Sequence, residues 1–430
     1  MLVDQYGRTR LFRGVNVVYK APPWHPATDR FDASTSFVEK DAEILAQLGI
    51  NAIRLAIHWA GAEPERGSFN QTYFDVMRTI IRTCARHGIY VLLEFHQDVL
   101  AQQFCGHGLP SWMIKIYANH DGMLDRFAEY WMRVATEYKD EPNLLGYEIM
   151  NEPWPGNHWR NPFLLLPGIA SQTTLFNMHK RVAAAIRSVD PQAIIYFEGA
   201  TWDIHNRAPT VPGGPNYANR SVLSYHYYRP PAIGSVRDTF RRRQQDAQRL
   251  GSGLFMTEFE MWWGPGNASE TGALARMRET VEAADEYLQN WMGWSYKSFA
   301  QAPNSTDASL FDEATGEQRP EMARLLSRPF VSAAQGNISA MRFDEAAGVF
   351  SVTLDRREPP AGSGGDGGGS GGAVADLEIS TARSTWFGGG LRVSVEPRGR
   401  SSWSFDALRQ RVSVRAQAGV RRVNVTVSAA

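Results

Sequence analysis

This chain of 430 residues has few cysteines, no net charge and no long apolar run. The two cysteines, Cys84 and Cys105, are too few for a disulfide framework, and the sequence leaves open whether they pair. Lysine plus arginine equals aspartate plus glutamate, at 45 each, so the composition suggests no nucleic-acid partner. No apolar run reaches the roughly 18 residues of a membrane span. The composition is therefore that of an ordinary globular protein.

The start of the chain also lacks the basic and then apolar layout of a signal peptide. Asn-x-Ser/Thr sequons are nevertheless frequent, and they occur at Asn70, Asn219, Asn267, Asn304, Asn337 and Asn424. Their number favours a secreted or lumenal glycoprotein whose leader lies upstream of these residues. A cytoplasmic location stays open.

Short apolar segments alternate with amphipathic helical segments as far as residue 330. The apolar segments are Phe12–Val18, Ala52–Trp59, Tyr90–Gln97, Leu144–Pro155, Ala193–Glu198, Val222–Tyr228, Leu254–Phe259 and Met292–Phe299. Such alternation predicts an α/β fold in which the strands close into a parallel (β/α)₈, or TIM, barrel over residues 1–330.

Beyond residue 330 the pattern changes to apolar and polar residues in strict alternation. It predicts a C-terminal β-sandwich domain over residues 331–430. Within this domain, residues 361–372 are so rich in glycine that we expect a mobile loop. The arginines near the C-terminus most simply line a solvated strand face, and contact with an anionic membrane is the less favoured interpretation.

Two glutamates stand at the ends of predicted barrel strands. Glu152 follows the apolar run that begins at Leu144, and Glu258 lies near the end of Leu254–Phe259. One such charge could simply cap a helix or join an ion pair. Two at the same mouth of a barrel are what glycoside hydrolysis requires, one as proton donor and one as nucleophile.

Further polar and aromatic side chains mark the other strand ends. They are Arg54, Glu94, His96, Asp98, Asn151, His226, Tyr228 and Trp294. Strand alternation places Glu94, His96 and Asp98 on one face. We expect Arg54 and Tyr228 to hold Glu258 ionised and the neighbouring anion to raise the pKa of Glu152. No metal or cofactor is expected, because no His/Cys/Asp cluster has the sequence spacing of a zinc site.

The motifs IRLAIHW, EFHQD, MNEP, YHYY, TEF and GWSYK occur in an order that resembles glycoside hydrolase family 5 of clan A. The resemblance implies that Glu152 is the acid/base and Glu258 the nucleophile. Arg54, His96, Asn151, His226, Tyr228 and Trp294 would then surround the sugar. The stretches GVNVVYKAPPW, HQDVLAQQFCGHGLPSW and NEPWPG resemble endoglycoceramidases and related glycosylceramidases, which implies a glycan contact for Lys20. Glu94, His107 and Glu260 depart from the usual pattern, and these departures concern specificity.

The resemblance implies a glycosphingolipid substrate cleaved with retention at the sugar–ceramide bond. The apolar loop Trp159–Ile169, together with Trp262 and Trp263, could contact lipid, a micelle or a membrane surface, but it could equally fold back as core. The alternatives are a steryl or alkyl β-glucosidase, an endo-glucanase or mannanase, and a non-catalytic sugar- or lipid-binding protein. We expect a monomer. The glycan preferred, and whether cleavage is endo or exo, stay open.

Overall fold

The computed structural model describes most of the chain, namely residues 1–98, 122–200, 203–229, 232, 234–261, 267–299, 309–357, 374–388 and 390–430. Predictions that concern Cys105, His107, Trp262, Trp263 or the glycine-rich residues 361–372 fall outside this part. Cys84 is buried and not in a disulfide.

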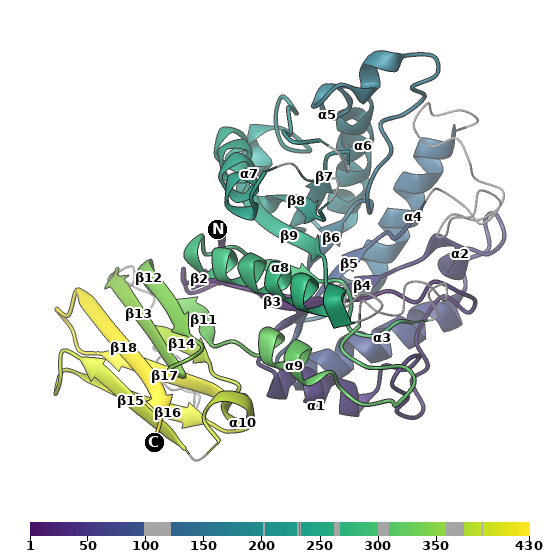
Figure 1. The fold of residues 1–430 in the computed structure, drawn as a ribbon. Coiled ribbons are helices and arrows are strands. Elements are labelled where there is room, and N and C mark those ends of the chain that lie inside the picture. Colours follow the sequence, from purple (N-terminus) through teal and green to yellow (C-terminus); the bar gives the residue numbers. More distant parts are fainter. Residues whose placement is uncertain are drawn as a thin grey trace, which may run out of the picture.

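Parallel strands close into a barrel in the order β10-β3-β4-β5-β6-β7-β8-β9 (Figure 1). The strands are β3 (Arg13–Val17), β4 (Ala52–Ala56), β5 (Tyr90–Glu94), β6 (Leu144–Glu148), β7 (Ile195–Glu198), β8 (Ser221–Tyr227), β9 (Gly253–Phe259) and β10 (Trp291–Gly293). The predicted barrel is confirmed. The predicted segments that begin at Leu144 and Met292 run too far, because the chain leaves the sheet soon after Glu148 and Gly293.

Helices surround this barrel. They are α1 (Glu39–Gln47), α2 (Trp59–Ala62), α3 (Gln71–Arg86), α4 (Met123–Tyr138), α5 (Ile169–Gln172), α6 (Thr174–Val189), α7 (Val236–Leu250), α8 (Asn267–Glu286) and α9 (Pro320–Leu326). Local sequence sets several ends: Asn70 caps α3 through the N–H of Tyr73, and Ser235 caps α7. Among the described residues, no helix combines the length and apolarity that crossing a membrane requires.

Two antiparallel sheets follow the barrel, as the sequence predicts. One has the order β1-β2-β11-β14-β17-β16 and the other β12-β13-β18-β15. Their strands are β1 (Leu2–Val3), β2 (Thr9–Arg10), β11 (Phe330–Ala334), β12 (Gly336–Asp344), β13 (Val349–Arg356), β14 (Leu377–Ser380), β15 (Leu391–Glu396), β16 (Ser401–Asp406), β17 (Arg411–Ala416) and β18 (Arg422–Ala429), with the short helix α10 (Arg383–Trp386).

The N-terminal strands β1 and β2 belong to the second unit, because β2 pairs with β11. The division at residue 330 in the sequence-based assignment does not account for these ten residues. Figure 1 shows the C-terminal sheets beside the barrel, next to α8 and α9. Ser380 on β14 contributes to this contact by donating to the carbonyl of Gly49 at 3.1 Å.

Candidate active site

Alternation along the strands stacks two layers inside the barrel. The lower layer is apolar and includes Phe12, Ala52, Leu92, Tyr196, Val222 and Phe255. Side chains two residues further on face the same way. They form a polar layer toward the carboxyl ends of the strands, and the layer includes Arg54, Glu94, Glu198 and Thr257, all buried. In a parallel barrel this end carries the chemistry.

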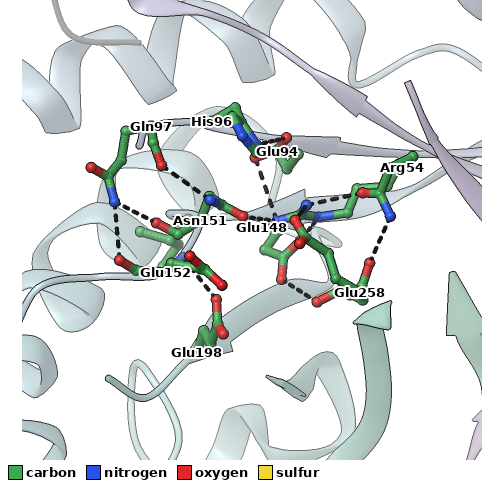
Figure 2. Close-up of polar contacts among 12 residues, drawn as sticks. Arg54, Glu94, His96, Gln97, Glu148, Asn151, Glu152, Glu198 and Glu258 are labelled. Carbon is green, nitrogen blue, oxygen red and sulfur yellow. Dashed lines mark hydrogen bonds and ion pairs between the residues drawn. The ribbon is translucent and has the colours of Figure 1, made fainter. Parts of the chain in front are cut away.

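Arg54 is the centre of the polar layer (Figure 2). Its guanidinium donates to Glu148 at 2.5 Å, to Glu258 at 2.6 Å and to Asn151 at 2.9 Å. It also lies 3.5 Å from Glu94. Although burial disfavours the charge, these carboxylates raise the pKa of Arg54 well above its ordinary value. Arg54 therefore stays a fixed cation beneath the two predicted catalytic residues.

Glu152 and Glu258 meet at the mouth of the barrel. A carboxylate oxygen of each lies within 4.8 Å of the other and of His226. The Nδ1 atom of His226 lies 2.9 Å from Glu152 and 3.4 Å from Glu258. Carboxyl groups about 5 Å apart suit retention of configuration, whereas inverting hydrolases separate them by roughly 6.5–9.5 Å. The predicted pair is thus brought together at the shorter of the two spacings.

Glu258 receives hydrogen bonds from two sides, as the sequence predicts. Tyr228 donates its hydroxyl to one oxygen at 2.7 Å, and Arg54 binds the other. Asn151, predicted to face the sugar, is 1% exposed and binds protein on both sides. It accepts from Arg54 and donates to the carbonyl of Gln97 at 3.0 Å.

The remaining predicted residues form a second group beside the pair. His96 lies 2.8 Å from Glu94 and 3.5 Å from Asp98, so the three do share one face. Lys20 pairs with Asp98 at 2.5 Å and lies 4.5 Å above the ring of Trp294, which stacks on His96. Lys20 and His96 also hold the pKa of Asp98 well below its ordinary value, against the effect of burial. Together they offer hydrogen-bonding groups and an aromatic face.

One electrostatic prediction is wrong. The pKa of Glu152 is lowered, not raised. Burial acts in the predicted direction, but the hydrogen bond and positive charge of His226 outweigh it. The sequence could not reveal this, because His226 is 74 positions away and its contact depends on barrel closure.

Comparison with known proteins settles the family. The model for the cellulases of glycosyl hydrolase family 5 matches residues 4–300. The chain belongs to glycosyl hydrolase family 5. It is 35% identical to an endoglycoceramidase from Cyanea nozakii over 406 residues, covering 82% of this chain and 79% of that one. It is likewise 35% identical to an endoglycoceramidase from Hydra vulgaris over 405 residues, covering 83% and 76%.

A solved structure shares the whole fold. Endo-glycoceramidase II from Rhodococcus sp., in its lactosyl-enzyme intermediate, superposes with a TM-score of 0.76 at 20% identity and covers 100% of this chain and 99% of that chain. The same protein in complex with ganglioside GM3 gives a TM-score of 0.77. This family 5 chain is therefore a glycoside hydrolase with the barrel-and-sandwich fold of that protein.

Several residues of this hydrolase site do not follow from the sequence patterns. Asn16, Gln97, Glu148 and Glu198 contact predicted residues, and Thr257 donates its hydroxyl to Glu148. Glu148 interrupts an apolar run and Glu198 ends one, and those positions were a usable signal. Strict alternation would point Gln97 away from the site, but β5 ends at Glu94 and the side chain of Gln97 reaches the carbonyl of Asn151.

Metal binding was not expected, yet the described part of the chain holds two groups of three potential ligand residues whose ligand atoms lie within 4.8 Å of one another in each group. They are Glu148, Glu198 and His226, and Glu152, His226 and Glu258. Both need His226 as a neutral ligand. Despite burial, the surrounding carboxylates Glu198 and Glu258 raise its pKa to about 10. A protonated imidazole competes with a metal at both places, and metal independence stays a prediction.

Three groups in this site have raised pKa values in the folded protein, and we therefore predict that the hydrolase loses stability above neutral pH. Nearby carboxylates raise the pKa of His96 to about 9 and of His226 to about 10 despite burial, and burial raises the pKa of Glu198 to about 8. At a pH between the ordinary pKa of each group and its raised pKa, the folded state therefore binds more protons than the unfolded state. Stability must fall as pH rises through this range.

We expect the melting temperature to decline steadily from pH 6.5 to 10, measured by differential scanning fluorimetry at constant ionic strength. His226→Gln should flatten the upper part of that decline, because the titrating ring is gone. A melting temperature that is constant or rises over this interval would contradict these protonation states.

Proposed function

We propose that this family 5 hydrolase is a retaining glycosidase that releases the intact glycan of a glycosphingolipid from its ceramide. The observation that carries the proposal is the close pair Glu152 and Glu258, together with an exposed apolar loop that begins a few residues after Glu152. The two relatives at 35% identity are named as endoglycoceramidases, which supports the same substrate class.

Glu258 is the nucleophile in this mechanism. Its oxygens accept from Arg54 and Tyr228, and both donors hold the carboxylate in place to attack the anomeric carbon. Attack breaks the bond to the ceramide oxygen, which takes the proton of Glu152. Water then displaces the enzyme from the glycosyl ester, and Glu152 accepts the proton of that water.

Glu152 must carry a proton when the first step begins, although its pKa is lowered in the free protein. His226 can supply that proton across the 2.9 Å contact between Nδ1 and Oε1. An ionised Glu152 beside protonated His226 holds as many protons as the neutral pair does. Transfer along this hydrogen bond needs no proton from solvent, but it is uphill in the free protein because the pKa of His226 is raised to about 10 and that of Glu152 is lowered.

Lys20, His96, Asp98 and Trp294 are suited to hold the glycan. Lys20 and Asp98 keep partial exposure, at 12% and 28% of their side chains, and they present charged donors and acceptors beside Trp294. Aromatic faces and charge-assisted hydrogen bonds are both favourable to sugars.

The apolar loop is the proposed ceramide and membrane contact. Trp159, Phe163 and Leu166 are 87%, 69% and 52% exposed, and Leu165 is 44% exposed. The loop contains a short 3₁₀ helix, η4 (Pro162–Leu165). Leu164 alone turns inward, at 4% exposure, toward Gly156. Apolar side chains exposed together beside a site indicate a lipid or partner surface.

Replacing Phe163, Leu165 and Leu166 by Ser should slow glycolipid cleavage about tenfold or more and leave a soluble aryl glycoside nearly unchanged. Burial of lipid methylenes contributes ~0.8 kcal/mol per CH₂, and tenfold in kcat/KM corresponds to about 1.4 kcal/mol. Initial rates on lactosylceramide in detergent and on an aryl lactoside measure the two effects.

Leu164→Ser provides the control, because this buried side chain should affect the melting temperature instead of the substrate ratio. Equal loss on both substrates by the triple variant, with a lower melting temperature, would identify the loop as core packing. No change on either substrate would also remove the loop from lipid recognition.

The substrate class is tested with fluorescent glucosylceramide, lactosylceramide and a ganglioside, together with a steryl glucoside and β-glucan, with products separated by chromatography. We expect intact lactose or ganglioside glycan plus ceramide. Release of single sugars would indicate exo action, and cleavage of only the steryl glucoside or glucan would overturn the glycosphingolipid proposal.

We further propose a monomeric, secreted or lumenal glycoprotein. The sequon residues Asn337 and Asn424 are exposed on β12 and β18, where a glycan would meet no core residue. Asn70 is less suited, since its side chain caps α3. Expression behind a signal peptide, followed by peptide-N-glycosidase treatment, should shift the mass, and Asn337→Gln should reduce the shift.

A further inference from the structure

The backbone at Glu152 has an unusual conformation. Its φ is +40°, in the left-handed region that residues other than glycine rarely adopt. Such a conformation costs roughly 1–3 kcal/mol and persists only where surrounding contacts enforce it. The mechanism above uses the carboxylate of Glu152 but does not explain what holds this turn.

Two side chains from the neighbouring strand ends hold the peptide groups on either side of this residue. Gln97 donates its amide to the carbonyls of Asn151, at 2.8 Å, and Glu152, at 3.0 Å. Glu198 accepts the N–H of Glu152 at 3.0 Å. The next residue is Pro153, which has no N–H to satisfy. Figure 2 shows Gln97 and Glu198 on opposite sides of the turn.

Both side chains are nearly inaccessible, at 3% exposure each. Gln97 follows β5 and Glu198 ends β7, and these two strands flank β6, which leads into the turn at Glu152. Burial raises the pKa of Glu198 to about 8, so near neutral pH it is mainly the neutral acid, and one of its oxygens still accepts a backbone N–H. Glu198 accepts the N–H of Glu152 and lies 3.7 Å from the Nε2 atom of His226.

We propose that Gln97 and Glu198 are positioning residues that fix the left-handed turn at Glu152 and so aim its carboxylate at the leaving oxygen. The proposal rests on the assignment of Glu152 as the acid in the proposed function. Neither side chain needs to touch substrate. Their effect on hydrolysis must therefore pass through Glu152 and share its dependence on the leaving group.

Leaving-group dependence separates this role from a general structural role. An acid is needed to expel a poor leaving group such as an alkyl alcohol, but a dinitrophenolate leaves without help. General acid catalysis contributes roughly 10²–10⁴-fold. A misplaced Glu152 carboxylate should thus lower kcat/KM for an alkyl lactoside and leave kcat/KM for 2,4-dinitrophenyl lactoside nearly unchanged.

The experiment compares Glu198→Leu, which removes the acceptor, with Glu198→Gln, which keeps an oxygen in the same place. We expect Glu198→Leu to lose about 10- to 100-fold on the alkyl lactoside and less than about threefold on the dinitrophenyl lactoside. Glu198→Gln should stay within about threefold on both. Circular dichroism confirms folding, and Gln97→Met repeats the test from the other side of the turn should Glu198→Leu not fold.

Equal losses on both substrates, or activity of Glu198→Leu and Gln97→Met equal to that of the wild type, would overturn the positioning role. Glu152→Gln is measured alongside. If that variant itself loses equally on both substrates, the acid assignment fails. If it shows the leaving-group dependence and the Glu198 and Gln97 variants do not, only the positioning proposal fails.

Discussion

Glu258→Gln should abolish hydrolysis of every substrate, including 2,4-dinitrophenyl lactoside, with a loss of at least about 10⁴-fold in kcat/KM. The amide keeps the size of the side chain and can still accept from Tyr228, whose hydroxyl lies 2.7 Å from the carboxylate. It has no charge with which to attack the anomeric carbon. A good leaving group cannot compensate, because the covalent bond to the enzyme cannot form.

Glu152→Gln is the matched comparison, since it removes the other carboxylate of the pair. We expect it to lose most of its activity on lactosylceramide and to keep most of its kcat/KM on the dinitrophenyl substrate. The reverse pattern, with Glu258→Gln active on the dinitrophenyl lactoside, would exchange the two roles.

Arg54→Met should be the most destabilising single change in the barrel. Arg54 is fully buried and binds Glu148 and Glu258 directly, with Glu94 close by. Removing one partner of a buried ion pair leaves an uncompensated charge and costs roughly 3–5 kcal/mol. We expect a loss of this size in the free energy of unfolding, measured by urea titration, together with loss of activity.

Arg86→Met supplies the control, because the pair of Arg86 with Glu39 is about half exposed. Exposed pairs contribute about 0–1 kcal/mol. If Arg54→Met were as stable as Arg86→Met, the carboxylates around Arg54 would have to take up protons or relax at little cost. The polar layer would then not depend on this cation.

The barrel could be predicted from sequence because its signal is local and repeated. Each strand is a short apolar run and each helix an amphipathic one, so errors at one element do not affect the others. Strand ends were less certain: Leu144–Pro155 contains both β6 and the turn at Glu152. Only the three-dimensional structure separates the strand that ends at Glu148 from the loop beyond it.

The site was predictable where a charged residue interrupts an apolar run at a strand end, as with Glu258. It was not predictable where function depends on distant partners. The lowered pKa of Glu152 requires His226, and the turn at Glu152 requires Gln97 and Glu198 from the flanking strands. The loop Trp159–Ile169 was unpredictable for a similar reason. Its residues are mostly apolar, and the sequence does not distinguish buried Leu164 from exposed Phe163.

Trapping the glycosyl-enzyme tests the two-carboxylate mechanism most directly. The protein is incubated with 2,4-dinitrophenyl 2-deoxy-2-fluoro-β-lactoside, whose fluorine slows the second step, then digested and analysed by mass spectrometry. We expect one 2-deoxy-2-fluorolactosyl adduct, on the peptide that contains Glu258 and absent from Glu258→Gln. An adduct on Glu152 or another residue, or steady turnover with inverted product and no adduct, would contradict a mechanism in which Glu258 is the nucleophile.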